Sequence, residues 1–334
     1  MMELVCPAGS PAALQAALQA GADAIYVGLR NVTNARAFPG LNFDRDKLQE
    51  AATAVHRAGK KIYLALNSYP LSDNEGVWRD SLAMAAEAGV DAFIIADMAV
   101  LAHAARTYPN IPRHLSVQGS ATNHAALKFY HENFGISRAI LPRVLSLLQV
   151  QRLIQRSPVP LEVFAFGSLC IMVEGRCQLS SFVTGRSPNC HGVCSPAEYV
   201  HWDELAGGQR QVRLGEILID RFAADEPASY PTVCKGRYRG LDDDAYYALE
   251  EPTSLNTLSL LPELAAAGVV ALKIEGRQRG PAYVSQVAGV WREALDRLTR
   301  DAQGFRIDAR WNEVLGHVAE GRQTTLGPYH RDWH

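Results

Sequence analysis

The chain has 334 residues and a formal net charge of −2, with 48% apolar and 20% charged residues. These values are those of an ordinary globular protein, and they exclude low-complexity, collagen-like and disordered chains. The near-neutral balance also excludes a nucleic-acid binder that works through bulk positive charge, although it leaves room for a local basic patch.

No stretch of the sequence predicts a membrane-spanning helix, which needs about 20 predominantly apolar residues. The best candidate, residues 92–105, is interrupted by Asp97 and His103. The first residues lack the basic and apolar segments of a signal peptide, so we expect a cytoplasmic protein. Because that compartment is reducing, the six cysteines are expected to be metal ligands, reactive thiols or core residues rather than disulfides.

One local pattern recurs along the chain: an amphipathic helix ends at a glycine, and a short apolar strand follows. The copies of the glycine and strand are residues 21–28, 89–97, 135–142 and 268–275. Further strands are expected at residues 4–6, 61–67, 114–118 and 161–166. The first helix is expected to follow Ser10 and to end at Gly21, with Pro11 in its first turn. Other helices are expected at residues 46–58, 75–88, 123–134, 145–154 and 282–298.

Eight strands that alternate with helices predict an α/β protein of the TIM-type (β/α)8 class, which usually takes about 250 residues. We expect the barrel to occupy residues 1–300 and to be interrupted after its seventh strand by an insertion at 167–261. Residues 301–334 then form a C-terminal extension. An open doubly wound sheet is the alternative, but no G-x-G-x-x-G follows a strand.

Five of the six cysteines lie in the predicted insertion, beside many glycines and prolines. Buried, inert thiols are one interpretation, but such residues normally lie on strands or helices among apolar neighbours. We favour a metal centre of four thiolates, either an iron–sulfur cluster or, less well, zinc. Cys6 ends a predicted buried strand, and we expect it to serve in packing.

Motifs for several other chemistries are missing from the sequence. There is no H-E-x-x-H or G-x-S-x-G motif for a protease, no P-loop, and no C-x3-C-x2-C for radical chemistry. Polar side chains instead follow the predicted strands, where a barrel builds its active site. The candidates for binding substrate are Arg36, Asn67, Gln118, Glu162, Lys273, Glu275 and Arg277. Arg36, Lys273 and Arg277 would clamp a carboxylated molecule, whereas an ion pair between Lys273 and Glu275 is the structural alternative.

Four segments resemble the signature of the collagenase-like peptidase family of unassigned mechanism, and the match runs over essentially the whole chain. They are residues 2–9, 162–177, 234–237 and 273–277. The resemblance implies one [4Fe–4S] cluster held by cysteines in the spacing C-x6-C-x16-C with a distant fourth. In this chain those positions are Cys170, Cys177, Cys194 and Cys234. Cys190 has no counterpart in the pattern, and it competes with its neighbour Cys194 for the third position.

Within this family the chain looks most like members that act in oxygen-independent ubiquinone biosynthesis. The resemblance implies a heterodimer with a homologous subunit, a lipid-carrier accessory protein, and hydroxylation of the ubiquinone precursor ring without molecular oxygen. Related members hydroxylate RNA bases, and for some of them prephenate is implicated as the source of the hydroxyl group. An RNA-base hydroxylase, an electron-supplying subunit and a collagenase-like peptidase are therefore alternatives. We do not expect nucleic-acid binding, because the basic set at Arg138, Arg143, Arg152 and Arg156 is more typical of a solvated helix face.

Overall fold

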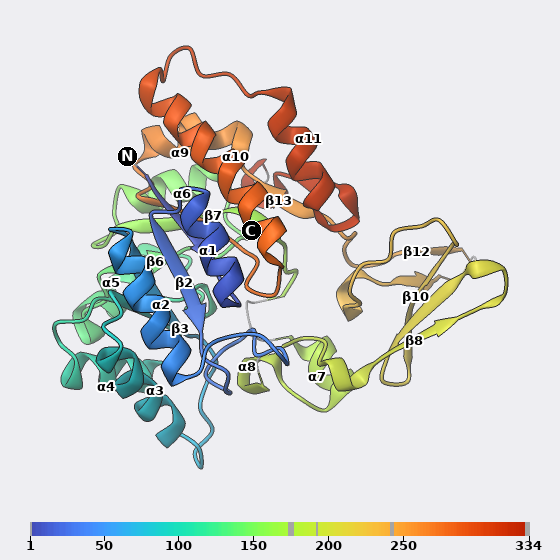
Figure 1. Cartoon of the computed structure of the whole chain (residues 1–334), viewed down its shortest axis with the longest axis horizontal. Helices are drawn as coiled ribbons and strands as arrows, with labels where there is room; N and C mark the ends of the chain where they lie inside the picture. Colours follow the sequence, from blue (N-terminus) through green and yellow to red (C-terminus); the bar gives the residue numbers. More distant parts are fainter. Residues whose placement is uncertain (1, 173–176, 192, 241–243, 331–334) are drawn as a thin grey trace.

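A computed structural model describes residues 2–172, 177–191, 193–240 and 244–330. Its main feature is a closed barrel of eight parallel strands with helices around it (Figure 1). Strand β14 pairs with both β7 and β1, which closes the sheet. The strands are β1 Glu3–Pro7, β2 Ala24–Gly28, β3 Lys61–Leu66, β4 Ala92–Ile95, β5 Arg113–Leu115, β6 Arg138–Ile140, β7 Leu161–Ser168 and β14 Ala271–Ile274. The predicted (β/α)8 fold is therefore confirmed.

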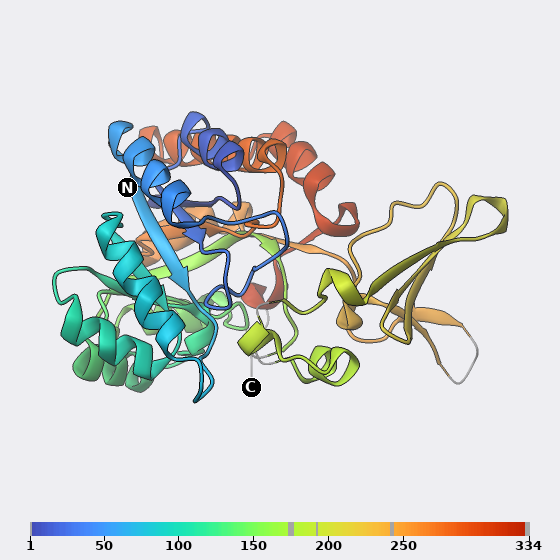
Figure 2. The same cartoon turned by 60° about the horizontal axis from the view of Figure 1, so that its bottom comes forward.

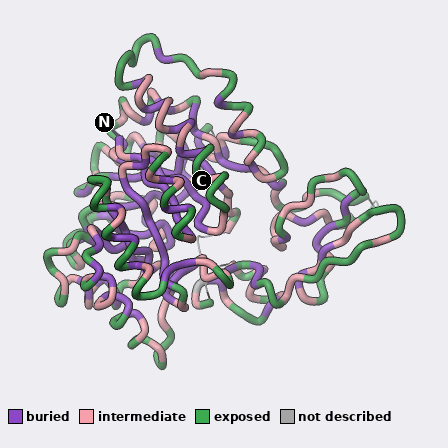
Figure 3. The backbone as a smooth tube through the Cα atoms, viewed as in Figure 1, coloured by how far each residue is buried: buried purple, intermediate pink, exposed green. Residues whose placement is uncertain are grey.

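The helices cover the outer face of the barrel, and their buried sides pack on the strands (Figure 3). They are α1 Pro11–Gln19, α2 Arg45–Arg57, α3 Gly76–Glu87, α4 Met98–Thr107, α5 His124–Phe134, α6 Leu147–Ile154, α9 Leu261–Ala267 and α10 Pro281–Arg300. Each helix predicted from the sequence is present. Helix α9 ends at Gly268, as the recurring pattern predicted, whereas helix α4 was not predicted. Asp97 begins α4 by accepting a hydrogen bond from the backbone amide of Val100.

Local chemistry sets the ends of these elements. Ser10 caps α1 by accepting a hydrogen bond from the amide of Ala13 at 3.2 Å. All four glycines that were expected to end helices have positive φ angles, where a side chain would be strained. These glycines are Gly21, Gly89, Gly135 and Gly268.

The chain leaves the barrel after β7 and forms a separate lobe beside it before it returns (Figure 2). Its helices are α7 Gln178–Thr184 and α8 Pro188–His191, and its strands are β8 Val200–Glu204, β9 Arg210–Leu214, β10 Ile217–Phe222, β11 Arg237–Arg239 and β12 Ala245–Tyr247. Strands β8, β9 and β10 form an antiparallel sheet with a small apolar core at Val212, Leu214, Ile219 and Phe222. Strand β13, Ser254–Asn256, then pairs antiparallel with β7 and returns the chain to the barrel.

The C-terminal part of the described chain packs against the barrel. Helix α11, Ala309–Val318, lies on α10, and strand β15, Thr324–Thr325, pairs with β13. Trp311 of α11 is buried and stacks on Phe305. None of the helices described here has the length and apolar character that crossing a bilayer requires.

The packing of α10 on α1 and β1 can be tested through Trp291, which is fully buried. We predict that Trp291→Ala lowers the free energy of unfolding by about 3–5 kcal/mol, because it leaves a large cavity in the core. Urea denaturation would measure this change. Phe182→Ala is the control, since Phe182 is 89% exposed and its loss should cost less than about 0.5 kcal/mol. Equal effects of the two changes would contradict the packing described here.

Candidate functional site

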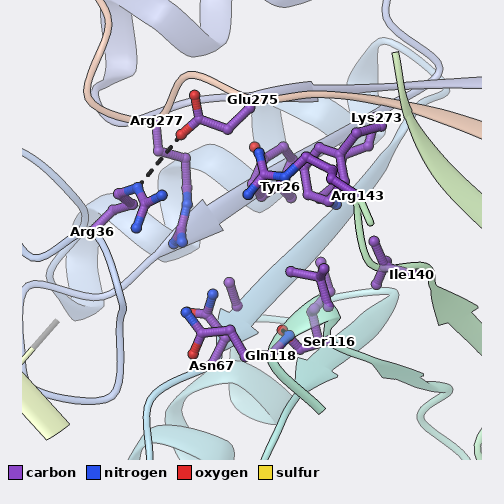
Figure 4. Close-up of a pocket in the computed structure, with 14 residues that line it drawn as sticks. Tyr26, Arg36, Asn67, Ser116, Gln118, Ile140, Arg143, Lys273, Glu275 and Arg277 are labelled. Carbon is purple, nitrogen blue, oxygen red and sulfur yellow. Dashed lines mark hydrogen bonds and ion pairs between the residues drawn. The ribbon is translucent and has the colours of Figure 1, made fainter. Parts of the chain in front are cut away.

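A pocket opens at the carboxyl ends of the barrel strands (Figure 4). Six of the seven predicted substrate residues line it: Arg36, Asn67, Gln118, Lys273, Glu275 and Arg277. They come from different segments that follow or end β2, β3, β5 and β14, so only closure of the barrel brings them together. The pocket also includes Tyr26 and Arg143, which were not predicted.

The pocket carries an excess of positive charge. Its lining holds four cationic side chains, Arg36, Arg143, Lys273 and Arg277, against the single carboxylate of Glu275. Guanidinium and ammonium groups in a site that is partly screened from water favour an anionic ligand. The arrangement can therefore bind a molecule with one or more carboxylate or phosphate groups.

Lys273 projects into the interior of the barrel from β14 and is 5% exposed. Its Nζ donates to Glu162 Oε1 at 2.9 Å and lies 3.8 Å from the centre of the Tyr26 ring. Burial lowers the pKa of Lys273, and the charge of Glu162 opposes that change. A chain of ion pairs continues from Glu162 to Arg138 at 3.2 Å and from Arg138 to Glu3 at 3.0 Å.

Glu162 does not line the pocket, which corrects the sequence-based placement of this residue. It is the second residue of β7 and pairs across the sheet with Ala271 and Ile140. It therefore lies near the amino ends of the strands, below the pocket, and is 1% exposed. Its role in this structure is to neutralise buried cations.

Arg277 is a buried guanidinium with no carboxylate partner within 4 Å among the described residues. Its Nη1 donates to the side-chain oxygen of Asn34 at 2.5 Å, and the group lies 5.5 Å from the centre of the Tyr26 ring. Burial lowers the pKa of Arg277 to about 10. A side chain at Gly28 would lie within 2.5 Å of both Asn34 and Arg277, so this position needs glycine. Within the described part of the chain the guanidinium makes no other hydrogen bond, so its remaining N–H groups can serve a ligand anion.

Glu275 pairs with Arg36, whose Nε lies 3.5 Å from Glu275 Oε1. Burial raises the pKa of Glu275, but the positive charges of Arg36, Arg143 and Arg279 and a hydrogen bond from Gln278 together outweigh burial, so the net shift is downward. The ion pair between Lys273 and Glu275 that the sequence allowed is not formed, since Lys273 pairs with Glu162 instead.

The opposite side of the pocket is uncharged (Figure 4). Asn67 holds the loop that follows β2, because its Oδ1 accepts from the amide of Ala35 at 3.1 Å. Gln118 lies in the 3-10 helix Val117–Gly119, and its buried Oε1 accepts no hydrogen bond from the described residues. The pocket therefore places amide groups across from its cations.

Arg143 is a pocket residue that sequence reasoning assigned to a basic helix face. Its Nη1 donates to the carbonyl oxygen of Ser168, and its guanidinium lies 4.3 Å from the centre of the Phe164 ring. The signal that could have found it is its position, three residues after β6 ends at the carboxyl side of the barrel. Arg138, of the same basic set, is also inside the barrel.

The segments that carry three of the cysteines predicted as ligands contact one another in the insertion. Cys177 precedes α7 and accepts from the amide of Ser180 at 3.4 Å, while the hydroxyl of Ser180 donates to the carbonyl oxygen of Cys194. Helix α7 in turn contacts the 3-10 helix Val233–Lys235, which carries Cys234. One short helix thus contacts all three segments.

The pKa of Cys194 and that of Cys234 are each raised in part by the charge of another of these cysteines, which is consistent with this arrangement. Cys194 is exposed, yet the protein around it displaces enough water to raise the pKa of its thiol, and the charge of Cys177 raises it further. Burial raises the pKa of Cys234 to about 11, and Cys194 contributes to the rise. For Cys190, burial alone raises the pKa, with no contribution from another thiol.

The remaining cysteines differ in their surroundings. Cys170 lies two residues beyond β7 and three residues before the start of segment 173–176, which is outside the described part of the chain. Cys6 is fully buried in β1, as expected for a packing residue, and burial raises its pKa strongly. Within the described ranges, no three His, Cys, Asp or Glu side chains are placed to hold one metal ion together.

Ser168 is the last residue of β7 and lies two positions before Cys170. Its hydroxyl donates to Glu320 Oε1 at 2.8 Å and accepts from Lys235 Nζ at 3.2 Å. Neither partner is a histidine that could act as a general base. The contacts instead tie β7 to the insertion and to the C-terminal extension.

Comparisons with known proteins place almost the full chain in one family. The model of peptidase family U32 matches residues 9–332. The tRNA hydroxylation protein P1 of Bacillus subtilis is 30% identical over 95% of this chain and 68% of its own length. The tRNA hydroxylation protein P of Escherichia coli is 30% identical over 99% of this chain and 75% of its own. The solved U32 peptidase Mk0906 shares the fold, with a TM-score of 0.50 and 13% identity, over 83% of this chain and 93% of that one.

The buried ion pairs below the pocket lead to a stability prediction. Glu162→Gln removes the carboxylate that pairs with both Lys273 and Arg138. We therefore expect the free energy of unfolding to fall by about 3–5 kcal/mol. Glu87→Gln is the control, because Glu87 pairs with Arg45 at an exposed site and the change should cost under about 1 kcal/mol. Chemical denaturation of both variants measures the difference. Similar losses of stability in the two variants would show that the buried cations do not need the carboxylate of Glu162.

Proposed function

The chain belongs to peptidase family U32, and from that premise we propose that it is an iron–sulfur component of an oxygen-independent hydroxylase. We propose further that it acts on the ring of a ubiquinone precursor, as the resemblance to UbiU implies. Its partner is then a homologous subunit similar to UbiV, which carries its own cluster. The observation that carries the proposal is the packing of the segments with Cys177, Cys194 and Cys234 around the short helix α7, in a chain whose barrel mouth holds a cationic pocket.

The donor set fits an iron–sulfur cluster better than a structural zinc site. The grouped side chains are all thiols, their spacing is irregular, and no C-x2-C pair is present. We assign Cys170, Cys177, Cys194 and Cys234 as the residues that would hold one [4Fe–4S] cluster. When bound, such a cluster supplies one-electron redox chemistry.

The pocket residues have the task of binding and orienting a small anionic co-substrate. Arg36, Lys273 and Arg277 converge on one volume, as a clamp for a carboxylated molecule requires. Glu162 keeps Lys273 charged from below, and Gly28 leaves room for Arg277. The quinone precursor itself is apolar, so the partner subunit and a lipid-carrier accessory protein are the proposed means of presenting it.

An RNA-base hydroxylase is the second candidate, because the relatives at 30% identity are named as tRNA hydroxylation proteins. Charge argues against RNA for this chain. The insertion beside the pocket, residues 167–261, contains 13 acidic but only 8 basic residues, a net charge of −5. Two of the four arginines of the predicted basic set, Arg138 and Arg143, are largely buried and so do not form an exposed basic surface for an RNA backbone.

A peptidase is less well supported by the residues at hand. Ser168 is held by Glu320 and Lys235 and has no histidine base among its described partners.

The ligand assignment predicts the outcome of single Cys→Ala changes in protein purified without oxygen. Replacing Cys170, Cys177, Cys194 or Cys234 should abolish the brown visible absorption and most of the iron. Cys6→Ala and Cys190→Ala are the controls and should keep both. Bleaching by Cys190→Ala but not by Cys194→Ala would overturn the assignment, and stoichiometric zinc without iron would overturn the redox function.

The proposed partnership predicts co-purification. Co-expressed with its homologous cysteine-bearing subunit, the chain should elute in size-exclusion chromatography as a heterodimer. A chain that stays monomeric beside this homologue, and that cleaves gelatin when purified, would contradict the proposal in favour of the peptidase.

The proposed clamp predicts how the pocket responds to a dicarboxylate. Succinate titrated by calorimetry should bind the wild type, and Arg277→Gln should weaken binding by about 1.5–3 kcal/mol through the loss of a charge-assisted hydrogen bond. Arg45→Gln removes an exposed arginine on α2 and should leave the affinity unchanged. Binding that survives Arg277→Gln at full strength would exclude Arg277 from the clamp.

A further inference from the structure

Lys273 differs chemically from the arginines that share its pocket. It is the third residue of β14 and pairs across the sheet with Phe164 of β7, which also lines the pocket. A lysine near the carboxyl end of a barrel strand lies where barrel enzymes carry out their chemistry. A guanidinium keeps its proton in a protein, whereas a lysine can lose a proton and then act as a nucleophile. Lys273 can therefore react with a ligand as well as attract it.

The surroundings of the Lys273 amino group supply a proton acceptor. Its Nζ donates to Glu162 Oε1 at 2.9 Å, and the side chain of Glu162 is 1% exposed. A carboxylate at this distance can take a proton from the ammonium group and return it later. Burial also lowers the pKa of Lys273, which makes the unprotonated amine easier to form.

The side chain of Tyr26 places this amine beside a site for a carboxylate. The Lys273 Nζ lies 3.8 Å from the centre of the Tyr26 ring, and the guanidinium carbon of Arg277 lies 5.5 Å from the same centre. Figure 4 shows the three side chains on one side of the pocket, across from Asn67 and Gln118. A small molecule whose carbonyl carbon reaches Nζ thus has a guanidinium nearby for its carboxylate.

We propose that Lys273 is the nucleophile of an imine-forming site, which takes the carbonyl group of a 2-oxo acid while Arg277 binds the carboxylate of that acid. The inference rests on the carboxylate clamp of the proposed function, and it needs no metal centre. The ammonium group of Lys273 gives one proton to Glu162, and the amine then attacks the carbonyl carbon. A proton moves from nitrogen to oxygen in the adduct. Glu162 returns its proton to the resulting hydroxyl, which leaves as water, and a C=N bond remains.

The product is an iminium ion, which carries the same positive charge as the ammonium group that it replaces. Glu162 therefore neutralises the nitrogen before and after the reaction, and the Tyr26 ring faces a cation in both states. No charge has to be created or removed inside the barrel, so the buried ion pairs below the pocket remain balanced.

The test is reductive trapping of the full chain with pyruvate and sodium cyanoborohydride, which delivers hydride to an iminium carbon. Mass spectrometry should show one adduct that adds the mass of pyruvic acid less one oxygen atom, and peptide mapping should place it on Lys273. Lys273→Met should abolish the adduct. Arg277→Gln should lower its yield at limiting pyruvate by at least about tenfold, because a charge-assisted hydrogen bond to the carboxylate is lost.

Lys235 is the matched internal control. Its side chain is also buried, 8% exposed, and pairs with the carboxylate of Glu320, but it is not among the described residues that line the pocket. The peptide that carries Lys235 should stay unmodified in the same wild-type sample, so the comparison does not depend on the folding of a variant. Equal labelling of Lys235 and Lys273 would overturn the inference.

Calorimetry separates a failure of this inference from a failure of the clamp. If pyruvate competes with succinate for the wild type but leaves Lys273 unmodified under trapping, the inference is wrong although the clamp stands. If neither pyruvate nor succinate binds, the clamp of the proposed function fails and the inference fails with it.

Discussion

A buried ammonium group that must be neutralised is the constraint on which the site depends. Lys273 enters the barrel interior from β14, and a cation there is costly unless it is paired. Closure of the sheet between β14 and β7 brings Glu162 within 2.9 Å of it. The carboxylate in turn needs Arg138, and Arg138 needs Glu3, so the pairs form a chain along the barrel interior. This chain fixes the floor of the pocket.

The pocket above that floor carries more positive than negative charge. Arg277 is buried and donates to the amide oxygen of Asn34, and Arg36 pairs with Glu275, whose pKa the charge of Arg143 also lowers. Positive charges held this way lower the cost of bringing an anion out of water. The insertion brings Cys194 and its neighbouring thiols to the same edge of the barrel, so that an anion site and a proposed redox centre adjoin each other.

The barrel could be predicted from the sequence because its signals are local, namely glycines that end helices and the apolar strands behind them. Helix α4 was missed because apolar residues lie on both sides of Asp97, its N-cap, so that the end of strand β4 and the start of the helix look alike. The pocket residues at strand ends could be predicted for the same reason as the strands, whereas Glu162 was misplaced because its position along β7 was not considered. The position of Arg143 in the pocket and the contacts of Cys194 depend on how segments distant in the sequence pack together. Local sequence patterns do not encode that packing.

The central claim is that four thiols hold an iron–sulfur cluster beside the anion pocket. Crystallography of anaerobically purified protein at the iron absorption edge tests it most directly, since anomalous scattering locates iron without reference to activity. The account predicts one iron-bearing peak among Cys170, Cys177, Cys194 and Cys234, on the side of the pocket where Arg36 lies. Iron bound elsewhere, or zinc at these cysteines, would contradict it.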